Sequence, residues 1–218
     1  MDKKQLALDI IERLKKEYPD AGCTLDYDHA WQLLVSVRLA AQCTDARVNI
    51  VVEELFAKYP SVAALAAAEP EDIEAIVKPC GLGHSKARDI SACMRMLRDK
   101  YDCRVPNTFE ELLALPGVGR KSANLIMGDV FGKPAIVTDT HCIRLCNKIG
   151  LVDGIKEPQK VEMALWKIIP PEEGSDLCHR FVMHGRAVCN ARKPECEKCC
   201  LKDICRTARE AAGQQAEP

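Results

Sequence analysis

Apolar residues recur along the chain at intervals of three and four positions, the spacing that puts side chains on one face of an α-helix. Strict alternation of apolar and polar residues, which is typical of a half-buried strand, hardly occurs. The helical spacing is clearest in four segments, which are residues 48–56, 87–97, 123–130 and 161–168. The pattern therefore predicts a protein built from helices.

Residues that favour helix starts stand before several of these segments. Asp45 and Ser85 are suitable N-caps, and Pro158 suits a first helical turn. Residues 31–41 are apolar on nearly all sides, which predicts a central, buried helix. Only residues 135–137 indicate extended chain, so we predict an all-α fold.

Two segments share one organisation and form a weak internal repeat. Residues 69–90 and 107–126 each read as a short acidic helix, a Gly-x-Gly turn and a second helix that opens with a lysine. The second copy has the better formed turn.

Composition excludes several classes of protein. The chain has 218 residues, of which 47% are hydrophobic and 29% charged, so it is neither disordered nor collagen-like. No apolar stretch reaches the roughly 18 residues of a membrane span, and the charged N-terminus does not resemble a secretory signal. Thirteen cysteines without an export signal indicate a reducing compartment, so we expect a cytoplasmic protein.

Charge is unevenly distributed. The formal net charge is -1, but residues 51–75 alone carry six acids and one lysine, so the remainder of the chain is net basic. Residues 185–210 contain seven basic and four acidic side chains. An anionic partner such as nucleic acid is therefore compatible with the charge pattern.

The sequence LPGVGRK, residues 115–121, joins two predicted helices through a turn with two glycines. Free backbone N–H groups converge at such a turn and at the start of the next helix, where they suit a phosphate. An ordinary tight turn between helices is the alternative. Pro116, Arg120 and Lys121 favour phosphate binding.

Four cysteines crowd into seventeen residues with the spacing C-x6-C-x2-C-x5-C; they are Cys189, Cys196, Cys199 and Cys205. Four thiolates so close together indicate a metal group. The single uneven run favours a [4Fe-4S] cluster over the two separated C-x2-C pairs that are usual for zinc, although zinc stays an alternative. Cys200 is the spare thiol and is expected not to be a ligand.

These motifs together resemble endonuclease III, a family of helix-hairpin-helix DNA glycosylases with an iron–sulfur cluster. The resemblance is carried by LPGVGRK, by VTDTH about twenty residues later, and by HGR leading into the cysteine run. It covers essentially the whole chain. It implies two helical lobes with a DNA groove between them, one from residues 22–132 and the other from residues 1–21 and 133–218.

The resemblance also implies a role for individual residues. Lys121 corresponds to the nucleophile and Asp139 to the carboxylate that assists it, while the four cysteines of the run would hold the [4Fe-4S] cluster. Residues implied to bind DNA are Gln42, Leu82, Gly117, Val118, Gly119, Arg120, His141 and Arg144. The sequence assigns no role to Arg38 or Cys43.

The function so implied is that of a bifunctional DNA glycosylase and abasic-site lyase of base excision repair, which removes oxidised or ring-saturated pyrimidines. Its partner would be double-stranded DNA with damaged bases or abasic sites, and the protein would be associated with the nucleoid. No membrane partner is expected, and a monomer is predicted because no sustained heptad seam occurs. Alternatives are a monofunctional mismatch glycosylase, a non-catalytic iron–sulfur module that binds DNA or senses redox state, and a zinc-stabilised binding protein.

Overall fold

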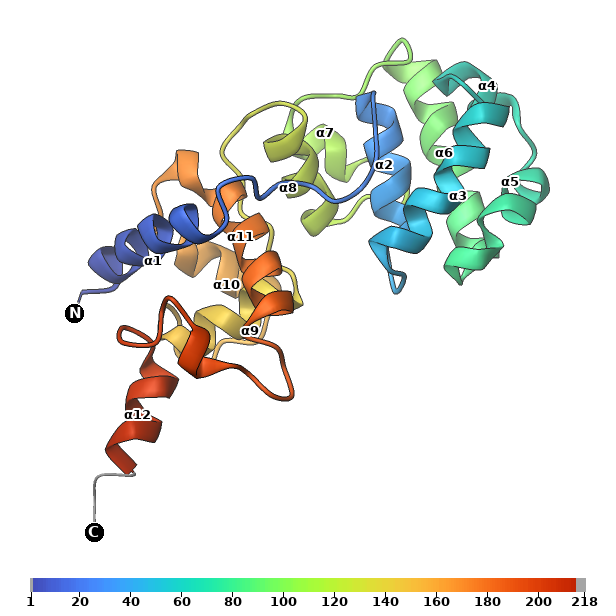
Figure 1. Ribbon diagram of the computed structural model, residues 1–218. Helices are drawn as coiled ribbons and strands as arrows, with labels where there is room; N and C mark the ends of the chain where they lie inside the picture. Colours follow the sequence, from blue (N-terminus) through green and yellow to red (C-terminus); the bar gives the residue numbers. More distant parts are fainter. Residues whose placement is uncertain (1, 215–218) are drawn as a thin grey trace. The chain divides into compact units, whose positions relative to one another are not determined.

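A computed structural model describes residues 2–214 of the chain. These residues form twelve α-helices and three short 3-10 helices, and they contain no β-strand (Figure 1). The prediction of an all-α fold is therefore confirmed. Among the described helices, none combines the length and the apolar character needed to cross a lipid bilayer.

The chain divides into two compact units. One is Cys23–Gly132, and the other combines the described residues of Met1–Gly22 and Lys133–Pro218. The first unit holds α2 (Ala30–Leu39), α3 (Asp45–Lys58), α4 (Val62–Ala67), α5 (Pro70–Val77), η1 (Lys78–Cys80), α6 (Gly83–Lys100), α7 (Phe109–Leu113) and α8 (Arg120–Asp129). The second holds α1 (Lys3–Glu17), α9 (Thr140–Ile149), α10 (Pro158–Leu165), η2 (Pro171–Glu173), α11 (Gly174–Ala187), η3 (Cys196–Lys198) and α12 (Arg206–Gln214).

In the unit Cys23–Gly132, α6 packs against both α4 and α5, and α2 contacts α3, α6 and α8. Helix α2 is buried along most of its length, as the apolar run predicted. Its Trp31 meets Phe56 of α3 edge to face, with ring centroids 5.1 Å apart. Both copies of the repeat form a helix, a turn and a helix: α5 with α6, and α7 with α8.

Two predicted N-caps lie too late in the sequence, Asp45 by one residue and Ser85 by three. Thr44, and not Asp45, is the N-cap of α3, because the Thr44 side chain accepts a hydrogen bond from the Arg47 amide. The Asp45 carboxylate instead accepts one from the Thr24 hydroxyl. Helix α6 begins at Gly83, two residues before Ser85, with left-handed Leu82 at the N-cap position. Pro158 does occupy the first turn of α10.

In the second unit, α11 packs against α9 and α1, and α12 packs against α9. Residues 135–138 are buried but join no strand. The first residue of α11, Gly174, lies so close to this segment that an added Cβ would come within 2.4 Å of the Ala135 carbonyl oxygen. The Val137 amide donates to the Cys178 sulfur of α11 at 3.2 Å. Helix α11 therefore fixes the short chain that leads to Asp139.

Candidate catalytic and cysteine sites

The turn between α7 and α8 requires a glycine at position 117. Gly117 has a left-handed φ of 74°, and a Cβ there would lie 2.8 Å from the Asp89 Cβ. Gly119 is the N-cap of α8 and supplies no side chain to the amides of the first turn. These amides keep their hydrogen-bonding capacity at the positive end of the helix dipole, which suits an anion.

Arg38, to which the sequence assigned no role, supports this turn. Its Nε donates to Asp89 of α6 at 2.7 Å, and its Nη2 donates to the Ser85 hydroxyl at 3.2 Å. The stem of Arg38 lies beside Gly117, since a Cβ on that glycine would be 3.1 Å from the Arg38 Cδ. A polar side chain in an otherwise apolar helix is thus explained by an ion pair that holds α2, α6 and the hairpin turn together.

Lys121 is exposed in the first turn of α8, two residues after the N-cap. Within its own unit, no hydrogen bond or ion pair of its ammonium group is found among the described residues. The neighbouring Arg120 guanidinium lies over the Phe109 ring, 4.9 Å from its centroid. The Lys121 amine is therefore free to reach a substrate, and its place at a helix N-terminus is unfavourable for a purely structural cation.

Gln42 and Leu82 occupy two exposed turns of the same unit. Both are non-glycine residues with left-handed φ, 56° for Gln42 and 51° for Leu82. Leu82 is 56% exposed, which is unusual for a leucine. Left-handed backbone at a non-glycine residue is costly and is often found at functional sites. Their insertion into DNA stays a prediction.

Asp139 is the N-cap of α9. Its Oδ1 accepts a hydrogen bond from the Cys142 amide at 2.7 Å, so the side chain caps this helix. The capping hydrogen bond uses only Oδ1 of the carboxylate, and the Asp139 side chain is only partly buried. Its catalytic role stays a prediction that the cap does not exclude.

His141 and Arg144 of α9 contact each other and the chain that leads into the cysteine run. The Arg144 guanidinium lies 3.0 Å from His141 Nδ1, and it donates to the carbonyls of Gly185 and Cys189. A Cβ on Gly185 would come within 2.4 Å of His141 Nδ1, so the glycine of HGR permits this approach. Arg144 thus has a structural role at the start of the cysteine run, while phosphate contact by either side chain stays a prediction.

Four cysteines of the run line one cavity. Cys189, Cys196, Cys199 and Cys205 contribute to its wall, and Cys200 does not. The Cys200 carbonyl instead accepts a hydrogen bond from Arg13 of α1. Burial raises the pKa of Cys199 to about 11, so a positively charged metal group would be needed to hold this thiol as a thiolate at neutral pH.

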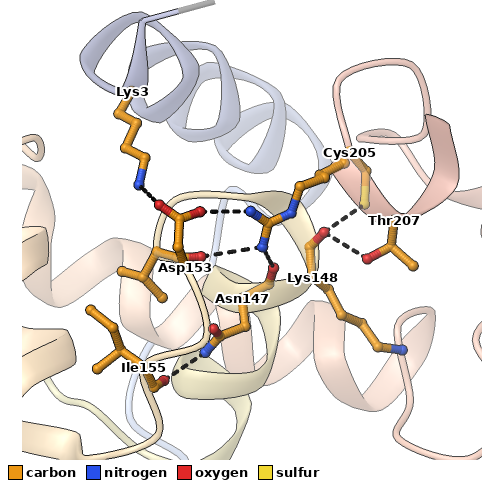
Figure 2. Close-up of polar contacts among 9 residues, drawn as sticks. Lys3, Asn147, Lys148, Asp153, Ile155, Cys205 and Thr207 are labelled. Atoms are coloured by element: carbon orange, nitrogen blue, oxygen red, sulfur yellow. Dashed lines mark hydrogen bonds and ion pairs between the residues drawn. The ribbon is translucent and has the colours of Figure 1, made fainter. Parts of the chain in front are cut away.

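The chain after Cys205 is anchored to the end of α9 (Figure 2). The Cys205 thiol and the Thr207 hydroxyl both donate to the Lys148 carbonyl, at 3.6 and 2.8 Å. Arg206 donates to the carbonyl of Asn147 and pairs with Asp153, which also binds Lys3 of α1. These contacts fix the position of the last cysteine of the run.

A buried histidine contacts the same run. His184 of α11 is 1% exposed, and its Nε2 lies 3.3 Å from the Cys199 sulfur. Its Nδ1 lies 3.1 Å from the Tyr18 hydroxyl. Neither contact of His184 was predicted from the sequence, in which the HGR motif is the one indication that His184 belongs with the cysteines.

Comparisons with known proteins agree with this geometry. Residues 35–171 match the family model described as HhH-GPD superfamily base excision DNA repair protein. The chain is 44% identical to endonuclease III of Synechocystis sp., covering 94% of both chains, and 37% identical to that of Escherichia coli, covering 93% of this chain and 95% of the relative. A solved structure of a trapped endonuclease III–DNA covalent intermediate has 40% identity and a TM-score of 0.90, over 97% of this chain and all of that one.

Proposed function

The chain belongs to the endonuclease III family of the HhH-GPD superfamily of base excision DNA repair proteins, and from this premise we propose that it is a bifunctional DNA glycosylase and abasic-site lyase. The observation that carries the proposal is Lys121, an exposed amine in the first turn of α8 directly after the glycine hairpin. Its substrates would be oxidised or ring-saturated pyrimidines in duplex DNA, and it would act on the DNA of the nucleoid in the cytoplasm.

In the proposed reaction Lys121 acts as the unprotonated amine, because an ammonium group has no lone pair with which to attack carbon. Its lone pair forms a bond to C1′ of the sugar, and the glycosidic electron pair leaves with the damaged base, which takes up a proton. Opening of the sugar ring gives a Schiff base. Loss of a C2′ proton then expels the 3′ phosphate by β-elimination, so one amine accounts for both activities.

Asp139 is proposed to assist this chemistry electrostatically. A carboxylate stabilises the positive charge that develops on the sugar as the base departs, and it can accept or return protons in the later steps. A carboxylate favours the protonated form of an amine, so it is not suited to activate an amine nucleophile directly. We therefore assign Asp139 to the sugar and to proton transfer, in addition to its role as the cap of α9.

DNA contacts are proposed for three surfaces. The amides of the 117–121 turn and the Arg120 side chain would hold a backbone phosphate. His141, Arg144 and basic residues of the 185–210 segment would hold others. Gln42 and Leu82 would fill the gap that an extruded nucleotide leaves in the stack. The 117–121 turn directly precedes α8, the Gln42 turn follows α2, and the Leu82 turn precedes α6 (Figure 1).

We propose that Cys189, Cys196, Cys199 and Cys205 hold a [4Fe-4S] cluster. Support comes from the cavity that all four line. The spacing of the four cysteines in one uneven run favours a cluster over the two separated C-x2-C pairs that are usual for zinc. The cluster would supply structural cross-linking and one-electron chemistry when bound.

The proposed function is tested on a duplex that carries a single abasic site and on one that carries a single ring-saturated pyrimidine. We expect strand cleavage on the 3′ side in both, measured on a denaturing gel. Base removal without cleavage would indicate the monofunctional alternative. Retarded DNA with an intact strand would indicate a non-catalytic binding module.

Cysteine variants test the cluster. Replacing Cys199 with alanine removes a proposed ligand, and we expect loss of most of the visible absorption and of the iron, which should be about four atoms per chain in the unaltered protein. Cys200→Ala is the matched control, because its thiol neighbours Cys199 but does not line the cavity. Its absorption and iron content should match the unaltered protein. Loss of the chromophore in Cys200→Ala alone, or zinc in place of iron, would contradict the assignment.

A further inference from the structure

Lys86 is a fully buried lysine that the proposed reaction does not use. It lies in the first turn of α6, with 0% of its surface exposed. Its Nζ donates hydrogen bonds to the carbonyl oxygens of Leu39 and Cys80, both at 2.8 Å. A charged group buried this completely needs compensation, so its partners indicate its purpose.

Both carbonyls belong to helix ends. Leu39 is the last residue of α2, and Cys80 is the last residue of η1. Carbonyls at helix C-termini lack a partner within the helix and lie at the negative end of its dipole, where a cation is favourable. The Lys86 ammonium therefore ties together two helix ends that are 41 residues apart in the sequence.

Each of these helix ends leads directly into one of the two left-handed turns. Gln42 follows Leu39 by three residues, and Leu82 follows Cys80 by two. A second contact joins the same turns, because the Cys43 side chain lies close enough to Cys80 to help raise the pKa of the Cys80 thiol. The backbone on either side of the Lys86 ammonium thus presents the two residues proposed to enter the DNA stack.

We propose that Lys86 is a positioning residue of base excision, which fixes the Gln42 turn relative to the Leu82 turn. Two side chains that fill one gap in the DNA stack must be held at a set spacing, and a single ammonium bound to both turns supplies that constraint. The inference rests on the proposed function. The lysines of the two repeat copies then have different roles, since Lys121 is exposed for chemistry and Lys86 is buried to hold the turns.

Replacing Lys86 with methionine tests the inference, because methionine keeps an unbranched side chain and removes the donors. Single-turnover removal of 5,6-dihydrothymine is measured in two duplexes, one with the lesion paired with adenine and one with it in an unpaired loop. An unpaired base costs less to extrude. We expect a drop of about 10- to 100-fold on the paired lesion and of less than about threefold on the unpaired one.

The ratio of the excision rates on the two duplexes distinguishes a positioning role from a general loss of folded enzyme. A loss of folded enzyme would lower both rates by the same factor. Lys100→Met, at the exposed far end of α6, is the matched control and should leave both rates unchanged. In a Gln42→Ala, Leu82→Ala background, Lys86→Met should lower the paired rate by less than about twofold, since coupled residues are not additive.

Several outcomes would overturn the inference. An equal loss on both duplexes, an unchanged paired rate, or a full additional loss in the double-alanine background would each show that Lys86 does not act through the two turns. If circular dichroism shows that Lys86→Met is unfolded, Lys86→Arg is measured instead. This variant should lower the rate on the paired lesion selectively, because its bulkier donor displaces the turns. Equal changes of the rates on the two duplexes would overturn the inference. No excision by the unaltered protein would contradict the proposed function instead.

Discussion

Replacing Lys121 with alanine is expected to abolish borohydride trapping of the protein on DNA with an abasic site. The covalent bond requires a primary amine, and the variant offers none in the first turn of α8. Base excision should fall by about 10⁴-fold or more, as is typical when a covalent nucleophile is removed. The measurements are the shifted band after reduction and the single-turnover cleavage rate. Because Lys121 is exposed and has no partner within its own described unit, folding should be unaffected.

Lys121→Arg is the matched variant that distinguishes a role of Lys121 as the nucleophile from a role as a phosphate contact. Its guanidinium keeps the positive charge beside the glycine turn but stays protonated, so it forms no Schiff base. DNA affinity should be within about threefold of the unaltered protein at fixed salt, while trapping is lost. A trapped band that persists in either variant would show that another amine is the nucleophile.

Replacing Asp139 with asparagine is expected to lower the rate of base excision by about 10²- to 10⁴-fold. Asparagine keeps an oxygen that can accept the hydrogen bond from the Cys142 amide, which the aspartate now accepts at 2.7 Å. The cap of α9 should therefore survive, with a change in unfolding free energy of less than about 0.5 kcal/mol. DNA binding should persist, since only the charge is lost. Excision at the original rate would reduce Asp139 to a cap.

Asp139→Ala is the companion measurement, because it removes the charge and the cap together. It should lose about 1 kcal/mol of stability in a denaturant titration, the usual cost of deleting an N-cap, and its excision rate should be no higher than that of Asp139→Asn. If the alanine variant alone loses activity, and loses it in proportion to its unfolding, the effect of Asp139 is structural.

Local periodicity predicted helices α3, α6, α8 and α10, since spacing of three and four residues reflects burial of one helix face. It predicted the buried helix α2, both helix-turn-helix copies and the absence of strands from residues 2–214. Helix starts were less predictable. Asp45 and Ser85 both have side chains that suit a cap, yet distant partners, Thr24 and Arg38, engage them instead. The choice among adjacent polar residues was made by tertiary contacts.

The sequence by itself determined the helical class, the glycine turn, the crowded cysteines and the family, because each depends on residues close together in the chain. Only the tertiary structure decided what Arg38, Lys86, Gly185 and His184 do. Each of the four contacts at least one residue that lies 15 or more positions away along the chain. Residues such as these show no periodicity, because their roles depend on individual hydrogen bonds and close approaches that exist only after the helices have packed.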